Sequence, residues 1–405
     1  MADEKHARDE RALIDEQEDV LEKDDQTGGR RMSRRRFLEA AGAAAAGWLL
    51  SRCVPGTDVP GTAMPTQEGG SAESMTAAPE PTATTAPPTA KPEATATPEP
   101  ATGELAAVSP GTKPKVAIGT ADSYDPDRID AVVRDMLDGI GGLGDIIGSG
   151  DRVAIKVNLT GGINNRAPGG YSPMETFVTH PEVVRALGGY LRDAGARELL
   201  IVEAVYEWGS YTQWGLEEAA EAIDATLIDL NSTDPYDDFA QVEVPGGGEI
   251  YESYTFNRIL QDVDAFVSVA KMKCHWTAGV THAMKNLVGL VPARFYQLTP
   301  QHSHRSAFHG PSDETAGHRI PRIITELNRA RSIDLAIVDG IMTTEGGEGP
   351  WIDLMAPVQP GVMFAGKDPV ATDAIATAAQ GYDPTAAGMT VPFVRSDNHL
   401  NLAHS

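Results

Sequence analysis

Residues 265–289 read Ala-Phe-Val-Ser-Val-Ala-Lys-Met-Lys-Cys-His-Trp-Thr-Ala-Gly-Val-Thr-His-Ala-Met-Lys-Asn-Leu-Val-Gly. The first six residues are apolar except for one serine, a run that predicts a strand buried on both faces. Two lysines follow the strand, and a Thr-Ala-Gly turn leads into a segment, 278–287, that we predict to be helical. A buried strand followed by a polar turn and a helix is typical of a parallel α/β sheet.

The sequence on both sides of this stretch alternates short β-branched runs with amphipathic segments. We predict strands at 115–119, 152–159, 199–204, 226–230, 265–270 and 335–338. We predict helices at 127–137, 181–194, 216–223, 278–287, 320–331 and 368–380. This alternation predicts an α/β fold, a mostly parallel sheet with helices on both faces in Rossmann-like layers. Segments 241–244 and 250–256 flank Pro-Gly-Gly-Gly and predict a small β-hairpin insertion.

Composition divides the chain into four parts. Residues 1–32 form an acidic lead-in with no core-facing pattern, and residues 54–112 are rich in Pro and Thr, so we predict that both are disordered. Residues 33–53 lie between them and have the pattern of an export signal. Residues 113–405 show no second linker, so we predict a single α/β domain there.

The export signal is indicated by Ser33-Arg-Arg-Arg-Phe-Leu38, which resembles a twin-arginine motif. The apolar stretch 37–50 that follows is shorter than the ~20 residues a transmembrane helix needs. We therefore expect the twin-arginine export machinery as a partner and an extracytoplasmic location. Leu49-Leu-Ser-Arg-Cys53 resembles a lipobox, although Arg52 departs from it. Two interpretations stay open: a lipid on Cys53 that tethers the protein to a membrane, or an unlipidated segment that is cleaved nearby or stays as an anchor.

Charge and cysteine content exclude some functions. The formal charge is −25, which disfavours nucleic acid as a partner because both surfaces are anionic. The chain has two cysteines, Cys53 and Cys274, too few for a ferredoxin-type iron-sulfur cluster. We also find no Gly-x-Ser-x-Gly elbow, Walker loop or dinucleotide fingerprint.

Candidate site residues follow from the predicted strand ends, because ligands of open α/β sheets bind at the carboxyl edge. Lysines beside a helix N-terminus suit a phosphate or a carboxylate. We predict an anion site of Lys156, Asn158, Lys271, Lys273 and Asn286, with catalytic roles for His275, Glu203 and Lys285. The alternative is an amphipathic helix with solvated lysines and a hydrogen-bonded histidine.

A metal site is the second candidate. Six of the ten histidines fall between residues 275 and 318, and imidazole with carboxylate is a common ligand set for divalent metals. We predict ligands at His302, His304, Asp339 and Glu345. The alternative is a histidine-rich surface loop.

Several motifs together resemble domain-of-unknown-function family 362 of bacteria and archaea. They are Lys271-x-Lys-x-His275 followed by Thr281-x-x-x-Lys-Asn-Leu-x-Gly289, Asp151-Arg-Val-Ala-Ile-Lys-Val-Asn158, His180-Pro-Glu-Val-Val-Arg-Ala-Leu187, Asp339-Gly340 with Glu345-Gly-Gly-Glu-Gly-Pro350, and Asp368-Pro-Val-Ala-Thr-Asp-Ala374. The resemblance implies an α/β domain of unestablished activity. Many relatives carry ferredoxin-like cluster modules, but this chain lacks the cysteines for one.

Two functional hypotheses result. The first is an exported enzyme, metal-assisted, that acts on an anionic small molecule at the carboxyl edge of the sheet. The second is a surface-tethered protein that binds a ligand or a cofactor without turnover. A purely structural module is a third hypothesis, but it gives no reason for Lys156 within an apolar strand.

Overall fold

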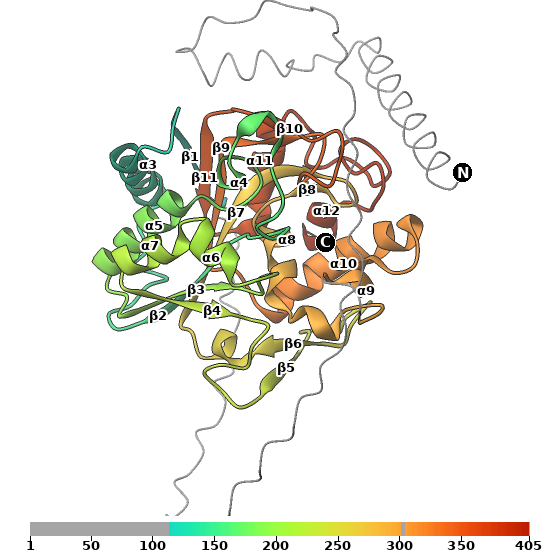
Figure 1. Cartoon of the computed structure of the whole chain (residues 1–405), viewed down its shortest axis with the longest axis horizontal. Coiled ribbons are helices and arrows are strands. Elements are labelled where there is room, and N and C mark those ends of the chain that lie inside the picture. Colours follow the sequence, from blue (N-terminus) through green and yellow to red (C-terminus); the bar gives the residue numbers. More distant parts are fainter. Residues whose placement is uncertain (1–112, 301–303, 405) are drawn as a thin grey trace, which may run out of the picture. The chain divides into compact units, whose positions relative to one another are not determined.

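The computed structural model describes residues 113–300 and 304–404. The predicted lead-in, export signal and linker lie outside these residues. One sheet has the strand order β1-β11-β9-β7-β2-β3-β4, with β8 beside β7 and β10 beside β9 (Figure 1). The strands of the main path are β1 (Val116–Thr120), β2 (Arg152–Lys156), β3 (Glu198–Glu203), β4 (Ala225–Asp229), β7 (Ala265–His275), β9 (Leu335–Glu345) and β11 (Val362–Gly366).

The sheet is mostly parallel, as predicted. Strands β4, β3, β2, β7 and β9 run in one direction, and β11 is antiparallel to both β9 and β1. The carboxyl ends of β2, β3, β7 and β9 therefore meet at one edge of the sheet, called the carboxyl edge below. Because β1 lies two antiparallel steps from β9, it points the same way, and the residues that follow it reach this edge too.

Helices cover both faces of the sheet (Figure 1). One apolar core lies under α3 (Pro126–Gly139), α5 (Pro181–Ala194) and α7 (Leu216–Ala222). The other lies under α10 (Asp313–Ala330) and α11 (Pro369–Ala379), beside α12 (His399–His404). α5 has the predicted bounds because the His180 side chain accepts a hydrogen bond from Glu182 N–H at its start and Gly195 ends it with φ 114°. The α/β fold class is confirmed.

The hairpin insertion is also confirmed. β5 (Phe239–Glu243) and β6 (Ser253–Asn257) form a separate antiparallel pair. The remaining short elements are α4 (Pro173–Thr176), α6 (Gly209–Gln213), α9 (Ser306–His309) and 3₁₀ turns at Pro168–Gly170, Arg258–Gln261, Leu287–Leu290 and Ala293–Phe295. No helix among the described residues is long and apolar enough to cross a membrane.

The prediction for residues 278–287 is wrong at its start. Gly279–Thr281 forms β8, which folds back on the end of β7, and the helix is only α8 (Ala283–Asn286). Gly279 has φ 74°, which allows the tight turn, and the β-branched Val280 and Thr281 suit a strand. β7 and β9 also run past their predicted ends at Ala270 and Val338, because β8 and β10 (Ala356–Val358) pair with the extensions.

Candidate functional site

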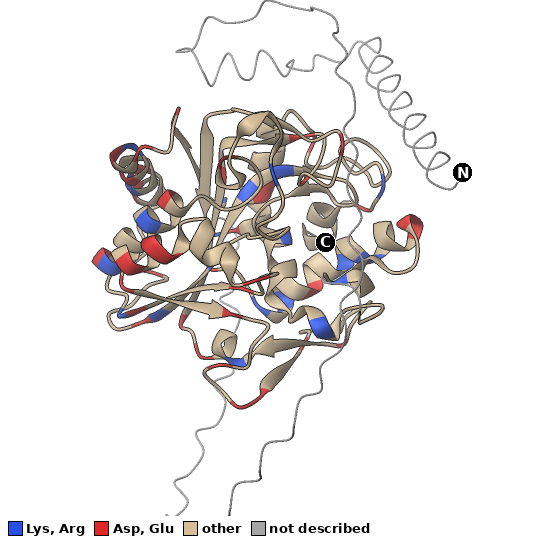
Figure 2. Ribbon diagram, viewed as in Figure 1, with Lys and Arg blue, Asp and Glu red and all other residues tan. Residues whose placement is uncertain are grey.

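Three lysines lie inside the fold on strands of the sheet: Lys156 on β2, and Lys271 and Lys273 on β7. Basic segments accordingly appear within the fold as well as on the outer helices in Figure 2. A buried ammonium is stable only with hydrogen-bond acceptors or a counter-charge around it. The partners of each lysine therefore decide which of them can serve a ligand.

Lys156 belongs to a closed network. Its ammonium donates to Glu203 Oε2 at 3.0 Å, to Asn286 Oδ1 at 3.2 Å and to Val157 O at 2.6 Å. Asn286 in turn donates to Lys156 O and to Ser268 Oγ. Three acceptors use the three N–H donors of an ammonium. Burial lowers the pKa of Lys156 and the Glu203 carboxylate opposes that shift, so we assign this group a role in shaping the edge.

Gly289 packs directly against the side chains of Glu203 and Lys156. A Cβ at this position would overlap Glu203 Oε1 and come within 2.7 Å of Lys156 Nζ. The backbone also fixes the carboxylate, because Leu159 N–H donates to Glu203 Oε2 at 3.1 Å. A larger residue would not fit at the end of the Lys-Asn-Leu-x-Gly pattern, which gives a steric reason for the glycine there.

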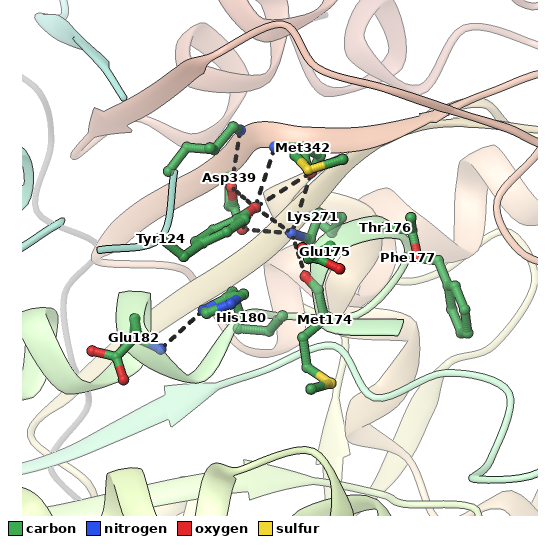
Figure 3. A network of polar contacts seen from close by, with 12 residues as sticks. Tyr124, Met174, Glu175, Thr176, Phe177, His180, Glu182, Lys271, Asp339 and Met342 are labelled. Atoms are coloured by element: carbon green, nitrogen blue, oxygen red, sulfur yellow. Dashed lines mark hydrogen bonds and ion pairs between the residues drawn. The ribbon is translucent and has the colours of Figure 1, made fainter. Parts of the chain in front are cut away.

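Lys271 forms a second closed network, drawn in Figure 3. The network lies on the face of the sheet that α3 and α5 cover. Its ammonium donates to Asp339 Oδ2 at 2.7 Å, to Tyr124 Oη at 2.8 Å and to Met174 O at 2.9 Å. Tyr124 donates to Asp339 Oδ1 at 2.9 Å and stacks on His180, with ring centroids 3.6 Å apart. Burial raises the pKa of Tyr124 well above its ordinary value, so the hydroxyl stays protonated.

Lys273 is buried but has fewer partners. Its ammonium donates to Phe177 O at 2.8 Å, and that carbonyl also accepts from Asn158 Nδ2 at 3.3 Å. Burial, together with the nearby charge of Lys285, lowers the pKa of Lys273 to about 7. The predicted Asn158 thus holds the backbone at Phe177, against which Lys273 rests.

Lys285 on α8 differs from the other lysines. Within residues 113–300 and 304–404, no hydrogen bond or ion pair engages its ammonium. Burial lowers its pKa to about 8, Glu348 raises it, and Arg305 lowers it further. Arg305 is itself buried and donates to Val291 O at 2.8 Å and Ala204 O at 3.2 Å.

His275 and Glu348 complete the surroundings of these cations. His275 Nδ1 accepts from Thr277 N–H and Ala278 N–H, both at 3.1 Å, and burial lowers its pKa well below its ordinary value. The ring is therefore neutral and carries its proton on Nε2, as a donor. Glu348 accepts from Trp276 N–H at 3.0 Å and Trp351 Nε1–H at 2.9 Å. Burial would raise the pKa of Glu348, but these hydrogen-bond donors hold it below its ordinary value.

We call the group Lys273, Lys285, Arg305, His275, His309 and Glu348 the edge cluster. Its members influence one another electrostatically, and Lys285 affects His275, His309 and Lys273. The cluster contains three cations and one carboxylate, because His275 is neutral and burial lowers the pKa of His309 to about 4. Outside the cluster, the Glu203 and Asp229 carboxylates oppose the effect of burial on the pKa of Arg305. The edge cluster is therefore electropositive within a chain of formal charge −25. Strongly shifted pKa values gathered at one strand edge are typical of functional sites.

The predicted metal ligands are not brought together among the described residues. Asp339 is paired with Lys271, and His302 lies outside the residues that the structure describes. In residues 113–300 and 304–404, no group of three or more His, Cys, Asp and Glu could hold a metal ion. We therefore derive no chemical step through a metal.

Sequence reasoning gave no site role to Tyr124, His180, Arg305 or Glu348. Glu348 follows Glu345 by three residues in the Gly-rich loop after β9, and this position indicates that it lies near the same edge of the sheet. Tyr124 and Arg305 had no such signal in the sequence. Tyr124 reaches the carboxyl edge because β11 lies antiparallel between β9 and β1, and that strand was not predicted. Arg305 precedes α9, a single helical turn that is too short to predict.

Comparison with known proteins then places the chain. A family model described as Domain of unknown function (DUF362) matches residues 153–378, more than half of the chain. The chain belongs to this family. The DUF362 range contains every member of the edge cluster, whereas Tyr124 lies before it. The description assigns no activity, so function has to be argued from the site.

Two individual proteins are similar to this DUF362 chain. A thylakoid-associated protein of Synechocystis sp. is 28% identical over 292 residues, covering 71% of this chain and 79% of the relative. A crystal structure of a protein from Thermotoga maritima aligns with a TM-score of 0.32 and 11% identity. That alignment covers 65% of this chain and 58% of the other, so it spans less than two thirds of the solved protein.

Proposed function

We propose that this DUF362 protein binds a small anionic molecule, a carboxylate or a phosphate, at the edge cluster. The observation that carries the proposal is Lys285, whose ammonium has no hydrogen-bond or ion-pair partner among residues 113–300 and 304–404. Lys273 and Arg305 add positive charge around it, and Glu348 is the one carboxylate that raises its pKa. Holding like charges together costs free energy, and an anion between them removes that cost.

The hydrogen-bonding capacity of the edge cluster supports the same ligand class. Lys273 uses one donor on Phe177 O, which leaves two, and His275 offers Nε2–H. Lys156 and Lys271 have their donors occupied, so they support the site without contacting the anion. We therefore propose that the anion contacts only Lys273, Lys285 and His275, fewer residues than the sequence predicted for the site.

An enzymatic role would rest on Lys273. An amine with a pKa of about 7 exists in both protonation states at neutral pH, which suits a general acid or base. His275 would act as a neutral hydrogen-bond donor, since its Nδ1 is occupied. The second candidate is binding without turnover, and the near-complete burial of Lys273 at 2% exposure favours it.

The test is the affinity of the full chain for inorganic phosphate and for oxalate, by isothermal titration calorimetry. We expect Lys285→Ala to weaken binding roughly ten-fold to a hundred-fold, the contribution of one charge-assisted hydrogen bond. Lys115→Ala is the matched control, because Lys115 is exposed at the start of β1, at the opposite edge of the sheet. Affinity should also fall as pH rises from 7 to 9, because Lys273 and Lys285 lose their protons. Equal affinities for both variants would reject the site.

The proposed location is the membrane surface outside the cytoplasm. It rests on the twin-arginine pattern at residues 33–38, and on a relative named for its association with thylakoids. Residues 33–53 would provide the attachment, through the apolar stretch or a lipid on Cys53.

A further inference from the structure

A cavity of about 250 Å³ lies beside β7, where its end faces β9 and the C-terminus of α11. Met272, Cys274, Thr343, Glu345 and Tyr382 contribute to its wall. Met272 and Cys274 alternate along β7 with Lys271, Lys273 and His275, so they point to the other face of the sheet. No member of the edge cluster lines the cavity, so the two sites are distinct.

The residues that line the cavity carry charge of one sign. Glu345 is the one charged residue among those that line it, and no Lys, Arg or His contributes. Ala379 and Gln380, at the C-terminal end of the 11-residue helix α11, also line it. The C-terminus of a helix carries partial negative charge. Both features favour a cation and disfavour the anions that we propose for the edge cluster.

One residue of the cavity wall, Thr343, has a buried hydroxyl without a hydrogen-bond partner among the described residues. Thr343 is 1% exposed, and its Oγ1 makes no hydrogen bond within the described part of the chain. A buried polar atom without a partner costs about 1–3 kcal/mol, so a ligand that supplies a donor or acceptor is stabilised there. The apolar part of the wall, with Met272, Val358 and Pro360, suits a hydrocarbon portion of the ligand.

We propose that this cavity binds a small primary amine: an ammonium group near Glu345 and Thr343, with an apolar body against Met272 and Val358. Its volume is below the ~300 Å³ at which ordinary ligand pockets begin, so the ligand is smaller than a drug-sized molecule. Cys274 Sγ lies 3.5 Å from Tyr382 Oη at the same wall. Occupation of the cavity should therefore shield this thiol.

The experiment uses the full chain and three probes of similar shape: benzylamine, benzyl alcohol and benzoate. Alkylation of Cys274 by N-ethylmaleimide is followed by peptide mass spectrometry, which separates Cys274 from Cys53. We expect benzylamine to slow alkylation several-fold, benzyl alcohol to do so more weakly, and benzoate to have no effect. Glu345→Gln should weaken benzylamine roughly ten-fold and remove its advantage over the alcohol. Thr343→Val, of similar shape, should weaken both.

Lys285→Ala separates this site from the edge cluster, because it should leave benzylamine protection unchanged. Equal protection by all three probes, or none by benzylamine, would overturn the proposal. Should Cys274 resist alkylation without ligand, the shift of the unfolding temperature with benzylamine gives the same comparison. A shift in the wild type that Glu345→Gln loses supports the site, and no shift rejects it.

Discussion

Replacing Asp339 by Asn should destabilise the domain strongly, because it removes the counter-charge of a buried ammonium. Lys271 and Asp339 lie 2.7 Å apart, and both side chains have 0% exposure. Removing one partner of such a pair costs about 3–5 kcal/mol. A domain of ordinary stability has only about 5–15 kcal/mol in total, so the loss is a large part of it. The free energy of unfolding is measured by urea denaturation, followed by tryptophan fluorescence at pH 7.5.

The matched control is Asp145→Asn, which breaks the ion pair with Lys367. Those side chains are 65% and 26% exposed, so the expected change is at most about 1 kcal/mol. A combined Lys271→Met, Asp339→Leu and Tyr124→Phe variant should recover most of the loss, because apolar side chains need no counter-charge. A cost for Asp339→Asn no larger than that for Asp145→Asn would refute the reasoning.

Three further predictions concern stability and location. Gly289→Ala should destabilise by several kcal/mol in urea unfolding, since its Cβ displaces Glu203 from Lys156, whereas Gly144→Ala, with open space around it, should change little. Burial lowers the pKa of His180 and His399 to about 3 in the folded protein. As pH falls below 6.5, these two histidines therefore become protonated in the unfolded chain but not in the folded one. The free energy of unfolding should therefore decrease from pH 6.5 to pH 4, by up to about 1.4 kcal/mol per pH unit for each histidine. Asp373, with a pKa raised by burial to about 7, opposes part of this trend, and His399→Leu should make the decrease shallower. Arg34→Lys with Arg35→Lys should retain the protein in the cytoplasm on cell fractionation, and unchanged export would contradict the twin-arginine assignment.

The sequence predicted the sheet well because its central strands are continuous apolar runs. β2, β3 and β7 lie buried on both faces, and α5, the long helix that follows β2, begins at the cap residue His180. β11 was missed since Val362–Gly366 is short and lies between turn residues. β8 was mistaken for helix because Val-Thr at 280–281 is too short for its period to be read.

The sequence predicted which charged residues lie at the carboxyl edge but did not predict how they pair. Strand ends indicate that Lys156, Glu203, Lys271 and Asp339 share an edge, and they do. Sequence spacing does not reveal that Lys156 and Lys271 each form an internal ion pair, because their partners Glu203 and Asp339 lie on other strands. The sequence also suggested a catalytic role for His275 and did not reveal that burial keeps its ring neutral.

The most direct test of the central claim is the position of a bound anion in crystals of the protein grown with selenate. Selenate has the shape of sulfate, and selenium is located by its anomalous scattering. Our account predicts the strongest peak within hydrogen-bonding distance of Lys285 Nζ, with Lys273 and His275 Nε2 beside it. A selenate bound only elsewhere, with the Lys285 ammonium in contact with water alone, would contradict it.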